Sequence, residues 1–285
     1  MAGSIPPSFA GKSPLAALFC GLPAQRMGPA IGPRSAPANP VAGKANPWKS
    51  SRPVIFDYSK RACEPEILDD LNLQTADLAQ NLQELEVVNQ RLGAYRFLRM
   101  SLRALLRAEG ARHWRLIDMG CGGGDALRAL CRDPQLHPGI ASWVGLDFNP
   151  SVLHYARAQA GNYPLEFKRL DLLDPEARYP ADIGMFNLVL HHFSDEEIIS
   201  LLQRAASQCR FLLISDLHRN AMAYQSFRVL SRLWRFSYVS RHDGKLSVRK
   251  SFVRRDWQRI LQAVPHRSVQ CQWHWSFRWN LIVKI

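Results

Sequence analysis

The residues best suited to chemistry lie between positions 118 and 125. Asp118 ends an apolar run, and four glycines follow it closely: Gly120, Gly122, Gly123 and Gly124. Glycine permits a positive φ and lets a ligand lie against main-chain N–H groups. An open, acidic turn of this kind suits a nucleoside-bearing cofactor that has a positively charged end.

Two common nucleotide motifs are not met. The dinucleotide fingerprint G-x-G-x-x-G needs a third glycine where this chain has Asp125. The pattern G-x-x-x-x-G-K-[ST] of triphosphate-binding loops occurs nowhere in the sequence. The turn therefore predicts neither of these two kinds of site.

The elements that must position this turn alternate along the chain. Apolar runs predict strands over 116–118, 143–147, 165–170, 183–190 and 211–215. Helical patterns lie between or after them, over 126–131, 150–160, 195–207 and 255–263. This order implies a mainly parallel sheet with right-handed crossovers, in which the strand ends open into one crevice.

The two ends of this region add further elements. Apolar residues recur at helical spacing from 77 to 108, and Gly93 divides or bends that helix. Residues 269–275 and 277–285 alternate in the manner of strands and are expected to pair as an antiparallel hairpin.

With these elements in place, Asp118-x-Gly120-x-Gly122-x-Gly124 resembles motif I of the class I S-adenosylmethionine-dependent methyltransferases. The resemblance extends over residues 85–285 and is greatest to the small-molecule branch that includes ubiquinone and menaquinone methyltransferases. It implies an α/β fold with a Rossmann-like, seven-stranded, mainly parallel sheet, a C-terminal antiparallel hairpin and helical cap elements. S-adenosylmethionine is the cofactor that it implies.

The resemblance also implies roles for single residues. Asp118 lies near the methionine ammonium, Asp147 holds the ribose hydroxyls, and Asp171 meets the adenine amino group. The full set expected at the cofactor is Asp118, Gly120, Cys121, Gly122, Gly124, Asp147, Phe148, Asp171, Leu172 and Leu190. Two alternatives stay open: Asp171 as a cap of the following turn, and Cys121 as a small filler or a nucleophile.

His191 and His192 follow the fourth strand, where the crevice should open toward the acceptor. Histidine titrates near neutrality, so either residue could deprotonate a phenol or an enol. Adjacent strand residues face opposite ways, which would leave only one of the two pointing into the site. A structural role for both is the alternative, and no metal site is expected.

Residues 216–250 are too long for a simple connection between the fifth strand and the next helix. Apolar and aromatic residues there suggest an amphipathic helix: Tyr224, Phe227, Leu230, Leu233, Trp234 and Phe236. Its other face carries Arg219, Arg228, Arg232 and Arg235, and His242-Asp243-Gly244 suggests a turn after it. We interpret the segment as a lid over the acceptor, with a solvated basic helix as the alternative.

The net charge of +13 is concentrated in two places. Residues 1–56 hold six basic and no acidic residues, whereas residues 219–259 hold eleven basic and two acidic ones. The second segment could receive an acidic carrier protein or rest on an anionic membrane surface. Nucleic acid is not expected, because the remainder is near neutral and the fourth strand lacks an N-P-P-[YF] tetrad.

Composition sets the expected domain organisation. Residues 1–52, rich in proline, alanine and glycine, are expected to be disordered, whether as a targeting segment or as an over-long reading frame. Residues 53–110 form a helical cap, and 111–285 form the methyltransferase domain, with its lid insertion at about 216–250. Six cysteines without C-x-x-C spacing favour a reducing, cytoplasmic compartment, with a peripheral membrane position as the variant.

The sequence therefore predicts a methyltransferase acting on a small or carrier-bound organic acceptor. O-methylation of a phenolic, polyketide-like or quinone-like hydroxyl fits the aromatic segment and the two histidines. A catalytically silent scaffold and an RNA or protein methyltransferase are the alternatives. The identity of the acceptor and the oligomeric state do not follow from the sequence.

Overall fold

The computed structural model describes residues 57–70, 75–110 and 113–285, so the extension expected at 1–52 lies outside the described residues. The chain divides into two compact units, Met1–Ser59 and Lys60–Ile285. All helices and strands of the described residues lie in the second unit.

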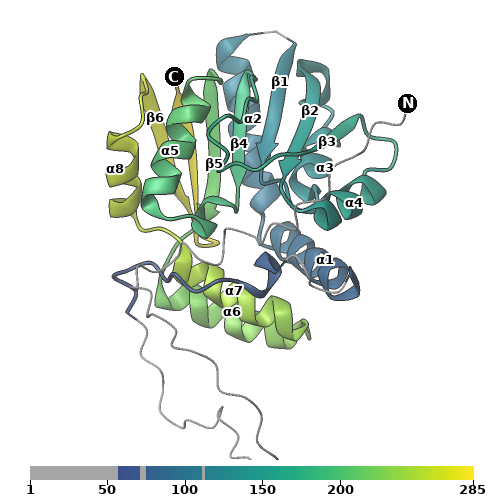
Figure 1. Cartoon of the computed structure of the whole chain (residues 1–285), viewed down its shortest axis with the longest axis vertical. Coiled ribbons are helices and arrows are strands. Elements are labelled where there is room, and N and C mark those ends of the chain that lie inside the picture. Colours follow the sequence, from purple (N-terminus) through teal and green to yellow (C-terminus); the bar gives the residue numbers. More distant parts are fainter. Residues whose placement is uncertain (1–56, 71–74, 111–112) are drawn as a thin grey trace, which may run out of the picture. The chain divides into compact units, whose positions relative to one another are not determined.

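A seven-stranded sheet forms the centre of this unit, in the order β3-β2-β1-β4-β5-β7-β6 (Figure 1). Strands β1 to β5 pair in parallel, and β7 joins β5 and β6 antiparallel. The mainly parallel sheet and its C-terminal hairpin are therefore confirmed. The strands are β1 (Trp114–Met119), β2 (Ile140–Asp147), β3 (Leu165–Arg169), β4 (Ile183–Asn187), β5 (Phe211–Leu217), β6 (Ser268–His274) and β7 (Arg278–Lys284).

Helices cover both faces of the sheet and enclose two apolar cores. One core joins α2 (Ala94–Glu109), α3 (Asp125–Cys131) and α4 (Pro150–Gln159) to one face. The other joins α5 (Asp195–Ala206) and α8 (Arg254–Gln262) to the opposite face. Because Leu116 lies in the first core and Ile117 in the second, successive residues of β1 serve opposite faces, as a buried strand requires.

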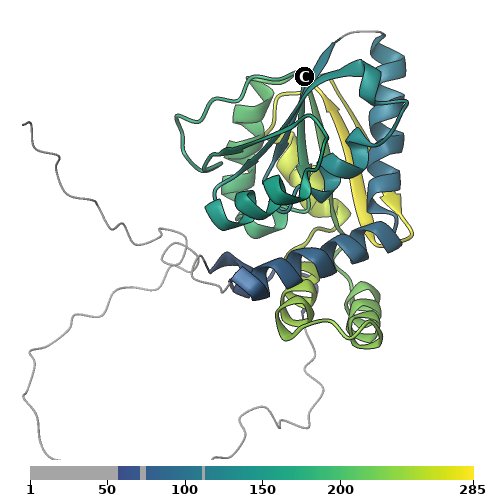
Figure 2. The same cartoon turned by 90° about the vertical axis from the view of Figure 1, so that its right-hand side faces the viewer.

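Three further helices lie beyond the carboxyl ends of the parallel strands β1 to β5, as Figures 1 and 2 both show. They are α1 (Thr75–Arg91), α6 (Ala221–Leu233) and α7 (Tyr238–Lys250). α7 packs against α1, α6 and two short 3-10 turns, η2 (Ile67–Asp69) and η4 (Leu190–His192). A third such turn, η3 (His137–Gly139), precedes β2. Among the described helices, none combines the length and apolar character needed to cross a bilayer.

Gly93, with φ of 74°, separates α1 from α2, which agrees with the expected break. α2 contributes Leu98, Leu102 and Leu105 to the core on the sheet, so this helix belongs to the layers of the fold. α1 instead packs on α7 and α4. The expected division at residue 110 between a cap and a domain stays a prediction.

Two local expectations were wrong. The fourth strand ends at Asn187 and not at 190, because the chain turns into η4 there. His242-Asp243-Gly244 forms no turn and lies inside α7. A Cβ on Gly244 would come within 2.2 Å of the Phe227 ring, so this glycine permits the close packing of α7 on α6.

Candidate functional site

The glycine turn is held rigidly against the neighbouring strand. The N–H groups of Gly120 and Cys121 both donate to Leu146 O, at 2.8 and 2.9 Å. Gly120, with φ of 75°, abuts Val189, whose side chain would lie 2.3 Å from an added Cβ. Gly122, with φ of 51°, has nothing within 4 Å of such an atom, so its exposed side is open to a ligand.

Asp118 is buried at the end of β1, with 1% of its surface exposed. Among the described residues, its Oδ1 atom has no hydrogen-bond partner. Burial, reinforced by Asp125 and Asp147, raises the pKa of Asp118 well above its ordinary value. A buried carboxylate without a donor fits a site that receives a positively charged ligand group.

Asp147 is fixed by two main-chain donors. Its Oδ2 accepts the N–H of Gly122 at 3.0 Å, and its Oδ1 accepts that of Asn149 at 3.0 Å. Burial raises the pKa of Asp147 in spite of these bonds. Each oxygen keeps a lone pair, so the carboxylate can still accept bonds from ligand hydroxyls. Phe148 follows it and is partly exposed.

The other expected cofactor residues differ in what their surroundings allow. Asp171 is exposed and accepts the N–H of Leu173 at 2.9 Å, so it caps a turn, and its adenine role stays a prediction. Leu172 and Leu190 are buried in the core shared with α5. Burial raises the pKa of the Cys121 thiol well above its usual value, which favours the filler role over that of a nucleophile.

A buried arginine that sequence reasoning missed lies near the same turn. Arg278, at the start of β7, is 1% exposed and donates from Nη2 to Asn89 Oδ1 at 2.9 Å. Its Nε and Nη1 atoms have no hydrogen-bond partner among the described residues. Burial lowers the pKa of Arg278 to about 10, although the carboxylates of Asp216 and Asp125 oppose this shift. No local sequence pattern around residue 278 indicates such a placement.

The two histidines lie in η4 and not in a strand, so the expectation that they face opposite ways was wrong. Their ring centroids are 4.4 Å apart. His191 is buried, and its Nδ1 lies 2.8 Å from Asp216 Oδ1 at the end of β5. A carboxylate can only accept, so the proton of the neutral ring is on Nδ1 and the lone pair is on Nε2.

Residues 60–70, which we call the strap, run across η4 and the end of α7. Arg61 anchors the strap by donating to Lys250 O at 2.7 Å and to Phe193 O at 2.8 Å. The same guanidinium pairs with Asp195 Oδ1 at 2.7 Å. Farther along, Asp243 in α7 accepts the N–H groups of Ile67 and Leu68, each at 2.9 Å. The strap has no periodic pattern, so no local sequence signal places it at the site.

The strap brings two carboxylates to the histidines. Glu66, 6% exposed, lies 3.9 Å from Nε2 of His191 and 4.0 Å from Nε2 of His192. Asp69 Oδ1 lies 3.2 Å from Nδ1 of His192, a distance typical of an ion pair, without hydrogen-bond geometry. Burial alone would lower the pKa of His192, but Glu66 and Asp69 raise it above its usual value. The ammonium of Lys250 lies 3.6 Å from Glu66 Oε1.

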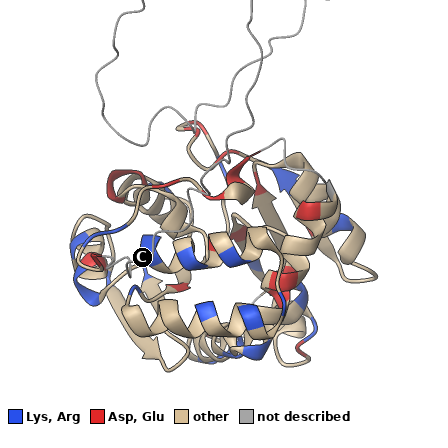
Figure 3. Cartoon of the chain, turned by 90° about the horizontal axis from the view of Figure 1, so that it is seen from below, with Lys and Arg blue, Asp and Glu red and all other residues tan. Residues whose placement is uncertain are grey.

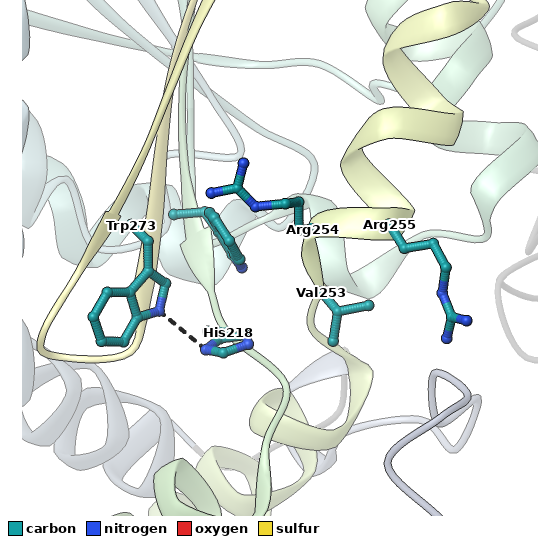
Figure 4. A pocket seen from close by; sticks show the side chains of 6 residues that line it. His218, Val253, Arg254, Arg255 and Trp273 are labelled. Atoms are coloured by element: carbon teal, nitrogen blue, oxygen red, sulfur yellow. Dashed lines mark hydrogen bonds between the residues drawn. The ribbon is translucent and has the colours of Figure 1, made fainter.

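A separate hollow of about 600 Å³ lies beside the terminal hairpin (Figure 4). Its walls are His218, Val253, Arg254, Arg255, Trp273 and Trp279. Trp273 donates from Nε1 to Nδ1 of His218 at 3.0 Å, the dashed contact in Figure 4. Burial, reinforced by the charge of Arg219, lowers the pKa of His218, so this ring stays neutral. None of the expected site residues lines this hollow.

The basic segment is only partly available as a surface. Arg219 is 2% exposed and pairs with Asp256 at 2.9 Å, so it lies inside the fold and not on the face of α6. Arg228 and Arg232 are exposed on α6 beside the apolar side chains of Val229 and Leu233, which are 54% and 70% exposed. Figure 3, which views the unit from the end where α6 and α7 lie, shows lysine and arginine positions recurring along the helices.

Comparison with known proteins agrees with this geometry. Residues 116–210 match the family model of a methyltransferase domain. A comparison with curated protein sequences finds no significant match. The matched segment contains the glycine turn, Asp147, Asp171 and the two histidines.

Solved structures share the fold at low sequence identity. Human N-acetylserotonin methyltransferase, in complex with S-adenosylmethionine, is 17% identical over 74% of this chain, with a TM-score of 0.53; the chain spans only 56% of that protein. The plantazolicin methyltransferase BpumL, solved with S-adenosylhomocysteine, is 17% identical over 74% of this chain and 95% of its own, with a TM-score of 0.53. An O-methyltransferase family protein from Burkholderia thailandensis is 19% identical over 71% of this chain and 59% of its own, with a TM-score of 0.50.

The sheet order and the terminal hairpin thus agree with the fold of these solved structures, and the glycine turn lies inside the segment matched by the family model. The chain has the Rossmann-like fold of the S-adenosylmethionine-dependent methyltransferases, and its residues 116–210 carry the sequence pattern of their methyltransferase domain.

Proposed function

We propose that the protein transfers the methyl group of S-adenosylmethionine to an oxygen atom of a small or carrier-bound organic acceptor. The observation that carries the proposal is the buried, unpartnered Oδ1 of Asp118 beside the open side of Gly122. When bound, the cofactor supplies a methyl group on a positively charged sulfur, which needs no further activation. The work of the protein is then to hold both reactants in line.

The residues around the turn suit the two ends of this cofactor. Asp118 offers an acceptor to the methionine ammonium, and the free Nε and Nη1 donors of Arg278 offer a partner to its carboxylate. Asp147 offers both carboxylate oxygens to the ribose hydroxyls. Buried groups of opposite charge, each with at least one atom that lacks a partner among the described residues, thereby match a zwitterionic ligand.

The acceptor is proposed to lie at His191 and His192, where the strap, η4 and α7 meet. Asp216 orients His191 so that its Nε2 carries the lone pair, which allows this atom to take up a proton. That arrangement supports a phenolic, polyketide-like or quinone-like hydroxyl as the acceptor group. The exposed basic and apolar face of α6 supports an acidic carrier protein or an anionic membrane surface as the source of the acceptor.

Binding of S-adenosylmethionine, measured by calorimetry, tests the first half of this proposal. In Gly122→Ala the new methyl group would occupy the open side of the turn, so affinity should fall by at least about tenfold. The matched control is Gly161→Ala, because Gly161 also has a positive φ, 58°, and nothing within 4 Å of an added Cβ. Both variants should lose about 1–2 kcal/mol of folding stability from the left-handed backbone.

The comparison of the two variants isolates ligand contact from backbone strain. Unchanged affinity in Gly161→Ala and weakened affinity in Gly122→Ala supports the turn as the cofactor site. No heat of binding to the folded wild-type protein would contradict the proposed activity. Methyl groups from labelled cofactor that appear in RNA or protein, and not in phenols, would change the acceptor class.

A further inference from the structure

Three side chains that can bind metal ions meet under the strap. They are Glu66 from the strap and His191 and His192 from η4, and one candidate ligand atom from each lies within 4.8 Å of the others. The carboxylate of Glu66 reaches both imidazoles, at 3.9 Å from one Nε2 and 4.0 Å from the other. We propose that Glu66, His191 and His192 bind a divalent transition-metal ion, which holds the oxygen atom of the acceptor.

The outer contacts of the two histidines favour this arrangement. Asp216 lies 2.8 Å from Nδ1 of His191, and Asp69 lies 3.2 Å from Nδ1 of His192. In metal sites the ring nitrogen that does not bind the metal usually faces a carboxylate or a carbonyl group. Asp216 holds the proton of a neutral His191 ring on Nδ1, so the lone pair of that ring is on the Nε2 atom that faces Glu66. Asp69 lies beside Nδ1 of His192 without hydrogen-bond geometry, and Nε2 of His192 also faces Glu66.

The charge of the cluster also favours a cation. Glu66 and Asp216 are buried, and Asp69, whose side chain is 35% exposed, adds a third negative charge, whereas the imidazoles are neutral as metal ligands. Lys250, whose side chain is 5% exposed, offsets one of these charges through Glu66 and Asp69. The positive charge of Arg278 interacts with the carboxylate of Asp216, but it is shared with the carboxylate of Asp125. Buried negative charge is costly unless it is paired, and a divalent ion between Glu66 and the two histidines would add positive charge beside these carboxylates.

The donor set indicates the class of metal. Two imidazoles and one carboxylate suit zinc, iron, cobalt or nickel, whereas magnesium and calcium prefer oxygen ligands alone. Three protein ligands leave a coordination position open for a further oxygen. None of the cysteines in the described part of the chain is among these ligands.

The role of this metal ion toward the acceptor rests on the proposed methyltransferase function. An acceptor hydroxyl at the open position would lose its proton to water, and its oxygen would be held as the anion. Methyl transfer then forms an oxygen–carbon bond and breaks the carbon–sulfur bond, whose electron pair stays on sulfur. A bound metal ion would occupy the Nε2 lone pair of His191, so the proton of the acceptor would then go to water, whereas in the metal-free protein His191 could take it up.

Zinc uptake by the whole purified chain tests the proposal without any methyl transfer. After removal of metal with a chelator, equilibrium dialysis against Zn²⁺ alone should give one ion per chain, and dialysis against Mg²⁺ should give none. His191→Ala and His192→Ala should each lower zinc affinity by more than tenfold, and Asp216→Asn by about 10–100-fold. His154→Ala is the control, because His154 is exposed on α4 and is not among the three grouped ligands.

Two further readouts keep the outcomes distinct. Binding of S-adenosylmethionine, measured on each variant, reports whether the fold and the glycine turn are intact, and His192→Gln replaces any alanine variant that does not fold. Absence of zinc from the folded wild type, or equal zinc affinity in His191→Ala and His154→Ala, overturns the metal site. Zinc uptake without cofactor binding leaves the metal site standing and contradicts the methyltransferase activity.

Discussion

The two halves of the site are built in opposite ways. The glycine-turn half uses main-chain atoms and carboxylates at the ends of adjacent strands, and its central residues, 118–125, are contiguous. The strap half is assembled from side chains of the strap, η4, β5 and α7, so Glu66 and Lys250 meet although they lie far apart in the chain. Backbone geometry defines the first half, and buried charge defines the second.

This difference has consequences for sensitivity to change. Main-chain donors in the turn are fixed by the pairing of the neighbouring strands, so replacing a single side chain there should change only the affinity for the cofactor. The strap is retained by a few charged contacts to η4 and α7, so removing one anchor should affect the whole acceptor half. The following predictions test that contrast, beginning with the largest effect.

Loss of the strap anchor should separate the two halves most clearly. Arg61→Ala removes four hydrogen bonds, to Lys250 O, Asp195, His191 O and Phe193 O, from a side chain that is 12% exposed. We expect the free energy of unfolding to fall by about 2–4 kcal/mol, since buried acceptors lose a charged donor. Methyl transfer should decrease strongly, whereas affinity for S-adenosylmethionine should stay unchanged.

Urea unfolding and cofactor calorimetry on the same preparation measure both effects of Arg61→Ala. The control is Arg178→Ala, because the side chain of Arg178 is 62% exposed and its carboxylate pair is at the surface. Equal loss of cofactor affinity and methyl transfer in Arg61→Ala would show that the two halves are not independent.

Asp147→Ala should damage the other half alone. The substitution leaves the N–H groups of Gly122 and Asn149 without their acceptor and removes the proposed partner of the ribose. We expect cofactor binding to weaken by about 1–3 kcal/mol, as for other stranded polar groups. Asp171→Ala should weaken it less, because Asp171 is exposed and caps a turn. Calorimetry of both variants gives the comparison, and a larger effect of Asp171→Ala would restore its adenine role.

Asp118→Asn should stabilise the cofactor-free protein against unfolding and should lower its affinity for S-adenosylmethionine. Burial, with Asp125 and Asp147 adding to it, raises the pKa of Asp118, so the folded state keeps this proton to a higher pH than the unfolded state. Stability is therefore lost as pH rises above about 4, and the asparagine variant avoids that loss. Its advantage in urea unfolding should be larger at pH 7.5 than at pH 5. A variant less stable than wild type at pH 7.5 would show that Asp118 is not strained in the free protein.

Cys121→Ala should have the smallest effect of the four. The thiol is buried, its pKa is raised, and it lies beside Gly145, where it fills space next to the turn. We expect a loss of about 1 kcal/mol of stability from the missing sulfur, with methyl transfer unchanged. A labelled-methyl assay is the test, and a lost turnover with intact cofactor binding would make Cys121 a participant.

How far the sequence predicted the site can be seen by comparing Asp147 with Glu66. Asp147 follows an apolar run, and the rule that parallel strand ends share one crevice places it beside the turn. Glu66 lies in a segment without periodicity, and its neighbours His191 and Lys250 are fixed only by how η4 and α7 pack. The position of the two histidines after a predicted strand indicates that they lie at the crevice, but the 3-10 turn that brings both rings together has no sequence signal.

Periodicity, glycine positions and strand ends are local properties, so the sequence alone predicts the alternating strands and helices, the break at Gly93, the terminal hairpin and the glycine turn. Three features follow only from the packing of the folded chain: the burial of Arg278 near the turn, the role of Gly244 in helix packing, and the closure of the strap over η4. These features depend on contacts between residues distant in the chain. Such contacts arise from burial and charge pairing in three dimensions, which no short stretch of sequence records.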